Sequence, residues 1–259
     1  MILPGAHLVA ESASSSVIDW FQLGSARSAD GPIPDQLWLT FWHAGVATLA
    51  AIAFAVPLAA VLAHYDKAEL LSATIVNLGR VIPTITILGV AVLVSLRRGL
   101  GFEPWPILIA LTVLTVPPIF ANTYTAVRGV APEVVAAARA MGLSERQILG
   151  RIELPLGAAL VITGIRVALV QALATEVIGA YFGGEGLGAY IRQGLVNKDF
   201  HEVQAGALMV TGLAMLVDFG LWAFSRFVQP SGLRRELRRT SRSTTRPAIA
   251  DGAVAAPAA

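Results

Sequence analysis

The sequence predicts an all-α integral membrane protein: a bundle of about five transmembrane helices with a helical elbow between two of them. Of its 259 residues, 55% are hydrophobic and 14% are charged. The mean hydropathy of +0.67 is well above that of an average soluble domain. Apolar stretches of roughly 20 residues, each enough to cross a bilayer as a helix, recur along the chain. Helix-capping signals in one polar connection predict the elbow.

The predicted elements follow each other in a simple order. We expect residues 1–36 to form an extracytoplasmic or interfacial arm, with Trp20 and Phe21 at the membrane surface. Residues 37–228 form the transmembrane domain. Its predicted spans are 37–64, 70–96, 105–127, 156–178 and 203–228. Residues 229–259 are predicted to be a basic and then low-complexity tail, disordered and cytoplasmic.

Arginines predict the orientation of these spans. They gather in the connection after the third span and again in the tail, and positive charge is retained on the cytoplasmic side of membrane proteins. Two spans separate the clusters, so both can lie in the cytoplasm with the N-terminus outside. Arg97, Arg98, Arg192 and Lys198 then oppose the rule, and we expect the larger clusters to prevail.

The elbow, residues 131–155, is predicted from its capping residues. Pro132 suits the first position of a helix, and Gly142 suits the left-handed residue that ends one. Ser144 and Gln147 have capping-box spacing, so a second helix starts almost at once. We expect it to run until Pro155 ends it or restarts the chain as the next span. Arginines at 139, 146 and 151 are expected to point outward.

The spacing within the elbow matches a known motif. Ala137 and Ala138 are followed by Gly142, and then, after nine intervening residues, by the run 152–155, Ile-Glu-Leu-Pro. This resembles the EAA loop of ABC importer permeases, through which such subunits engage their ATP-binding partners. Ala136 occupies the usual position of the glutamate, while Glu133 lies one turn earlier on roughly the same face. The resemblance implies that the ATPase subunit is contacted by Glu133, Ala136, Ala137, Arg139, Gly142, Leu143 and Arg146.

Polar residues inside the apolar spans are candidates for a translocation path, because charge in a membrane usually faces a partner, a cavity or a pathway. Arg166 and Glu176 share the fourth span but are about 15 Å apart along a helix axis, too far to pair. Arg80 either lines a path or snorkels to the interface. The candidate path residues are Thr84, Thr86, Asn122, Tyr124, Arg166 and Glu176.

Three further segments resemble one permease subgroup. The run 118–124 is P-I-F-A-N-T-Y, residues 164–166 are G-I-R, and residues 183–188 are G-G-E-G-L-G. They are similar to segments of permeases that import glycine betaine, carnitine and choline, where the glycine-rich stretch precedes an outward-facing short helix. The resemblance implies a type I ABC importer permease fold in the bacterial plasma membrane and a role in carrying such compatible solutes or proline-type osmolytes. The implied partners are cytoplasmic ATP-binding subunits, an identical or homologous second permease and an extracytoplasmic substrate-binding protein.

Missing motifs exclude several kinds of chemistry. The two lysines, Lys67 and Lys198, do not follow glycine, so the chain has no phosphate-binding G-x-x-x-x-G-K-[ST] loop. The four histidines are scattered, and the chain contains no cysteine. We therefore expect no enzyme activity, catalytic residue, metal or cofactor in this chain, with ATP and Mg²⁺ in a partner subunit, and no nucleic-acid partner. The alternatives are a permease for another small solute, a non-transporting scaffold, and an ion-coupled secondary transporter, which Arg166, Glu176 and Asp218 motivate.

Overall fold

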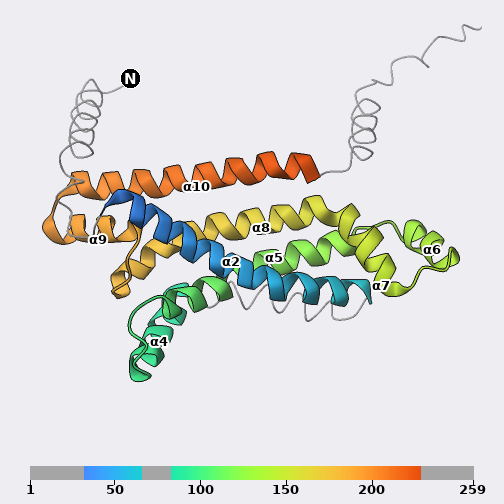
Figure 1. The fold of residues 1–259 in the computed structure, drawn as a ribbon, viewed down its shortest axis with the longest axis horizontal. Coiled ribbons are helices and arrows are strands. Elements are labelled where there is room, and N and C mark those ends of the chain that lie inside the picture. The colour runs from blue at the N-terminus through green and yellow to red at the C-terminus, as the bar shows by residue number, and fades with distance from the viewer. Residues whose placement is uncertain (1–31, 66–82, 229–259) are drawn as a thin grey trace, which may run out of the picture.

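The computed structural model describes residues 32–65 and 83–228, and in these residues all regular secondary structure is helical (Figure 1), which confirms the all-α class. The long helices are α2 (Ile33–His64), α5 (Trp105–Arg128), α8 (Leu154–Glu176) and α10 (Phe200–Val228). The shorter ones are α4 (Thr84–Arg97), α6 (Pro132–Ala140), α7 (Glu145–Ile148) and α9 (Leu187–Asn197). The predictions for the arm up to residue 31, for Arg80 and for the tail from residue 229 lie outside the described residues.

Within the described residues, four helical segments are long and apolar enough to cross a membrane: 33–64, 105–128, 145–182 and 200–226. They overlap four of the five predicted spans. Of the predicted span 70–96, only the part in α4 is described, and this helix is apolar but short. The chain is therefore a multi-pass membrane protein.

Two spans begin earlier than predicted. Helix α2 starts at Ile33, inside the predicted arm, because Pro34 fits the first turn of a helix and Asp35 complements its dipole. Helix α10 starts at Phe200, because the carboxylate of Asp199 accepts hydrogen bonds from the backbone N–H groups of residues 201 and 202. In both cases the capping chemistry extends the helix past the end of its apolar run.

Small residues hold the centre of the bundle together. Helix α2 buries a row of alanines against α5 and α8, namely Ala44, Ala47, Ala51, Ala55 and Ala59. Residues spaced three or four apart lie on one helix face. Because alanine is small, the neighbouring backbones approach closely, and dispersion contacts drive helix association in a membrane. Phe120 of α5 and Ala168 of α8 share the cluster around Ala51.

Helix α8 is continuous with the elbow, so of the two outcomes predicted for Pro155 the structure shows the second, the start of the next span. The π-helical turn η2 (Leu149–Glu153) joins α7 to α8 without a break. Proline lacks the N–H of a regular α-helical hydrogen bond, and a π turn changes the hydrogen-bond register just before that residue. Pro155 thus lies in the first turn of α8, where prolines are tolerated.

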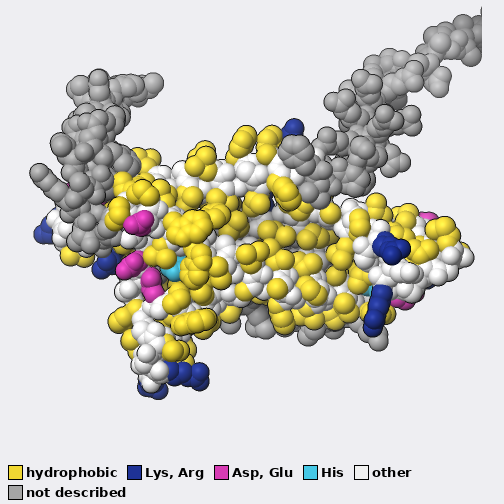
Figure 2. Space-filling view, viewed as in Figure 1, with side chains coloured by type: hydrophobic (Ala, Val, Ile, Leu, Met, Phe, Trp, Pro, Cys, Tyr) yellow, Lys and Arg dark blue, Asp and Glu magenta, His cyan; other side chains and the backbone are white. Residues whose placement is uncertain are grey.

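The two ends of the bundle carry different elements. The elbow lies at one end, next to the end of α2, and α10 runs from α9 toward the elbow end (Figure 1). The 3₁₀ helix η3 (Val177–Phe182), the glycine-rich turn 183–186 and α9 lie at the opposite end, with the start of α2. The short helix expected after the glycine-rich stretch is therefore present. Hydrophobic side chains cover the sides of the bundle, and charged ones gather toward its ends (Figure 2).

Candidate functional site

The elbow turns at Gly142, as the sequence predicts. Its φ angle is +84°, a left-handed conformation that side chains disfavour. The N–H of Gly142 donates to the carbonyl of Arg139 at 3.0 Å, and the N–H of Leu143 donates to that of Ala138 at 3.2 Å. These two bonds form a Schellman motif, which satisfies the last carbonyls of α6. The turn is therefore set by the backbone and does not depend on partners.

The second helix of the elbow starts with the predicted capping box. The backbone N–H of Ser144 donates to Oε1 of Gln147 at 2.9 Å, and the Ser144 side chain accepts from the backbone of Gln147 in return. The buried side chain of Ile148 anchors this helix to the bundle. Both halves of the elbow are thus fixed relative to the turn.

The outer surface of the elbow presents most of the predicted coupling residues. The exposed ones are Glu133, Ala136, Ala137, Arg139, Gly142 and Arg146, while Leu143 is half-buried. The structure adds two apolar side chains that the sequence analysis did not name, since Met141 is 72% exposed and Val134 is 42% exposed. Apolar side chains exposed among charged ones are typical of a protein-binding surface.

The elbow also carries an ion pair. The guanidinium of Arg139 donates from Nε and Nη2 to the two carboxylate oxygens of Glu145, at 2.9 and 3.0 Å. This hydrogen-bonded carboxylate raises the pKa of Arg139 above its usual value. Glu145 in turn lies 2.9 Å from His64, the last residue of α2. Sequence reasoning missed Glu145 and His64, because no local pattern links positions so far apart in the chain.

The candidate path residue Arg166 forms an ion pair inside the transmembrane domain. Its Nε and Nη2 donate to the two carboxylate oxygens of Asp218 on α10. The side chains are 34% and 38% exposed and border a groove of about 520 Å³ between α8 and α10. Trp222 and Phe219 stack on each other along this groove, with ring centroids 5.4 Å apart. Asp218 was seen in the sequence as an intramembrane charge, but its partner was not.

Asn122 and Tyr124 are half-buried on α5. Nδ2 of Asn122 donates to the carbonyl of Pro118 at 2.8 Å, and Tyr124 stacks on Phe120. A Cβ atom on Gly164 would lie only 2.6 Å from Cβ of Asn122. The two segments that resemble the osmoprotectant subgroup on α5 and α8 therefore pack directly against each other.

Glu176 is buried at the end of the bundle opposite the elbow. Its carboxylate accepts a 3.1 Å hydrogen bond from Oγ1 of Thr40 and lies 3.2 Å from Nδ1 of His43. The same Thr40 hydroxyl oxygen accepts from the N–H of Leu187 at 2.8 Å. In this single chain Thr40 of α2 therefore links the residue after the glycine-rich turn to Glu176 of α8, whose side chain is only 1% exposed.

A second contact holds the glycine-rich turn at this end. The N–H of Glu185 donates to the carboxylate of Glu103, which precedes α5. Burial raises the pKa of Glu103 above its usual value. The turn is thus bonded from two sides, by α2 and by the connection before α5.

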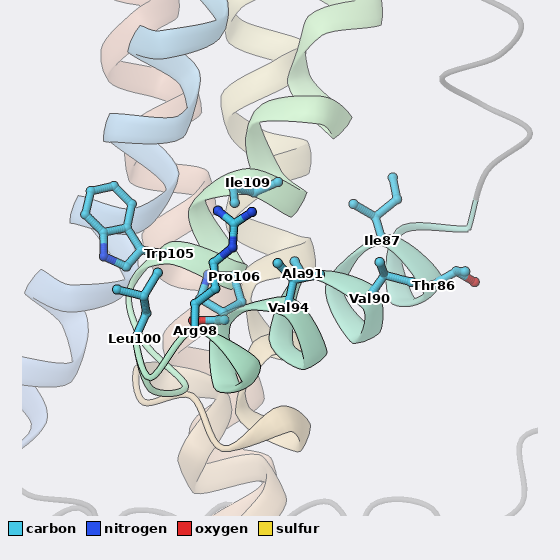
Figure 3. A pocket seen from close by; sticks show the side chains of 11 residues that line it. Thr86, Ile87, Val90, Ala91, Val94, Arg98, Leu100, Trp105, Pro106 and Ile109 are labelled. Carbon is cyan, nitrogen blue, oxygen red and sulfur yellow. The ribbon is translucent and has the colours of Figure 1, made fainter.

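Thr84 and Thr86 lie apart from the other candidates, in the first turn of α4. Thr86 lines a mostly apolar pocket of about 470 Å³ between α4 and the start of α5 (Figure 3). Arg98 and Trp105 border the same pocket (Figure 3). The predicted path residues thus do not form one cluster within a single chain. Among the described residues, no three histidine or acidic side chains are placed to hold a metal ion.

Comparison with known families gives a match over most of the bundle. Residues 45–231 match the family described as "Binding-protein-dependent transport system inner membrane component". The match begins within α2 and ends just beyond α10, so it includes the elbow, the groove and the glycine-rich turn.

Individual relatives and solved structures agree with this match. The chain is 32% identical over 204 residues to the choline transport system permease protein of Bacillus subtilis, covering 78% of this chain and 92% of that protein. It is 29% identical to a carnitine transport permease protein of Listeria monocytogenes, covering 77% and 89%. Its fold is similar to a chain of the MetNI methionine ABC transporter in an inward-facing conformation, with a TM-score of 0.67, 21% identity, and 75% and 94% coverage.

Proposed function

We propose that this chain, which belongs to the family of binding-protein-dependent transport system inner-membrane components, lines the translocation path for a solute with a quaternary ammonium group. The chain is a transmembrane permease subunit of an ABC importer. Glycine betaine, carnitine and choline are the proposed substrates. A relative of Bacillus subtilis named as a glycine betaine/carnitine/choline transport system permease is 31% identical over 189 residues, covering 73% of this chain and 85% of that protein.

The geometry of the elbow supports docking of a cytoplasmic ATP-binding subunit. Two short helices turn at Gly142 beyond the end of the bundle and expose Met141 and Val134 beside charged side chains. A second permease, identical or homologous, would complete the path, and a substrate-binding protein would deliver the solute outside. With the elbow in the cytoplasm, the start of α2 and the glycine-rich turn face outward, and the end of α10 faces inward (Figure 1).

The groove between α8 and α10 is the proposed border of the path. A charged pair exposed to lipid in the middle of a span is costly, so Arg166 and Asp218 should face water or protein. A carboxylate and aromatic rings attract a quaternary ammonium ion, the latter by cation–π attraction. Phe219 and Trp222 provide such rings along one groove, where Arg166 already neutralises the carboxylate of Asp218.

Family membership favours this function over an ion-coupled secondary transporter. The charges that motivated the alternative have structural partners, since Arg166 pairs with Asp218 and Glu176 contacts Thr40 and His43. The alternative that this permease carries a different small solute is tested by the choice of solutes. The three named solutes and an unrelated amino acid therefore belong in the same experiment.

Purification of the chain from its native membranes, with identification of the co-eluting subunits, tests the assembly. We expect an ATP-binding subunit to co-elute. A matched preparation carrying Met141→Glu should lose it, because a charge replaces an exposed apolar contact. If the chain elutes without any ATPase under conditions that keep other importers intact, the proposal is wrong.

A further inference from the structure

Four ionisable side chains connect the elbow to the end of α2. Arg139 of α6 binds Glu145 of α7 through both carboxylate oxygens. Oε2 of Glu145 lies 2.9 Å from Nε2 of His64, and Nδ1 of His64 lies 2.6 Å from Oε2 of Glu153 in η2. We call these residues, Arg139, Glu145, His64 and Glu153, the His64 cluster. The cluster joins three parts of the elbow, α6, α7 and η2, to α2.

The two contacts of His64 differ in geometry. Nδ1 of His64 and Oε2 of Glu153 lie 2.6 Å apart and form a hydrogen bond. Nε2 of His64 lies 2.9 Å from Oε2 of Glu145 but makes no hydrogen bond there. The bond to Glu153 is therefore the more specific of the two contacts.

His64 is the buried centre of this arrangement. Its side chain is 1% exposed and that of Glu153 is 5% exposed, whereas the outer members Glu145 and Arg139 are 41% and 51% exposed. The hydrogen bond between His64 and Glu153 is therefore shielded from water, whereas the Arg139–Glu145 pair is exposed to it.

Helix α2 links this cluster to the other end of the bundle. His64 is its last residue, and near its first turns Thr40 accepts from the N–H of Leu187 and Gln36 accepts from that of Gly186. The helix is unbroken over its 32 residues. A displacement of the elbow that moves α2 would thus reach the glycine-rich turn directly.

We propose that His64 is a positioning residue for energy coupling, because its two carboxylate contacts make α2 follow the elbow when the ATPase moves it. This inference rests on the proposed function of the elbow as the ATPase contact. The His64 cluster also provides contacts to an elbow in which Ala136 occupies the position where the motif usually has glutamate. Glu145 and Glu153, from the second half of the elbow, make these contacts instead.

The test uses the permease with its ATP-binding subunits in proteoliposomes, with the substrate-binding protein and radiolabelled choline, carnitine or glycine betaine. Solute uptake and ATP hydrolysis are measured together, and their ratio gives the coupling. We expect His64→Gln to keep the ATPase bound but lower this ratio about tenfold, the factor for an interaction of about 1.4 kcal/mol. His201→Ala, at an exposed histidine of α10, is the matched control.

A wild-type ratio in His64→Gln would overturn the proposal. Should His64→Gln fail to assemble, Glu145→Gln and Glu153→Gln test the same contacts from the elbow side, and normal ratios in both contradict the proposal. An unmodified complex that takes up none of the three solutes contradicts the proposed function instead. The two failures are therefore distinguishable.

Discussion

Arg166 of α8 and Asp218 of α10 form an ion pair with two hydrogen bonds across a groove in the transmembrane domain. Each side chain is about one third exposed in the single chain. The pair therefore links α8 to α10 and also exposes charge within the transmembrane domain.

Removing one partner of this pair should harm both folding and uptake. Asp218→Asn leaves Arg166 without its carboxylate, which costs about 1–3 kcal/mol at a partly exposed site. We expect a lower yield of folded protein in the membrane and slower solute uptake by the protein that remains. Asp218→Glu, which keeps the charge, should lie close to the wild type. Equal yield and uptake in the Asn variant and the wild type would show that the pair has no role.

The turn of the elbow should be intolerant of a β-branched residue. Gly142→Val forces a side chain into a left-handed conformation, at a cost of about 1–2 kcal/mol. We expect normal membrane insertion with loss of ATP-driven uptake. Gly150→Val is the control, because Gly150 lies in the same elbow with open space around it and no positive φ. Normal uptake by the Gly142 variant would contradict the coupling role of the turn.

Close packing of α5 against α8 gives a third prediction. Gly164→Val places Cβ at 2.6 Å from Cβ of Asn122 and 3.0 Å from the carbonyl of Pro118, so the helices must separate. We expect a loss of stability of about 1–3 kcal/mol, measured as a lower unfolding temperature in detergent. Gly212→Val, where a Cβ meets nothing within 4 Å, should change it little. Equal shifts in the two variants would argue against this contact.

The elbow should tolerate the glutamate that its motif usually carries. Ala136 is exposed on α6, so Ala136→Glu adds a charge without a steric clash. We expect the ATP-binding subunit to bind with unchanged affinity in a pull-down titration. Loss of binding would mean that this elbow docks differently from the loops it resembles.

Local rules predicted the parts of the structure that depend on neighbouring residues. The left-handed turn at Gly142 and the capping box at Ser144 follow from residue types within a few positions. Apolar length predicted four of the spans. Pro155 was predicted either to end the elbow or to start the next span, and it lies in the first turn of α8. The π turn before it was not predicted, because a proline alone does not indicate a change of hydrogen-bond register.

Pairs between distant segments could not be predicted in the same way. Arg166 and Asp218 were both visible as intramembrane charges, yet nothing local shows that α8 and α10 face each other at these positions. His64 and Glu153 are separated along the chain by α4, α5, α6 and α7, and they meet only through the packing of the elbow on α2. Glu176, expected to line a path, is buried against Thr40 in the single chain, and its role in transport stays a prediction.

ATP-driven uptake by the purified importer tests the central claim most directly. The chain, its ATP-binding subunits and the substrate-binding protein are reconstituted in liposomes, and radiolabelled glycine betaine, carnitine, choline and an unrelated amino acid are offered in turn. The account predicts ATP-dependent accumulation of at least one quaternary ammonium solute and none of the amino acid. Accumulation of the amino acid alone, or uptake that needs an ion gradient in place of ATP, would contradict it.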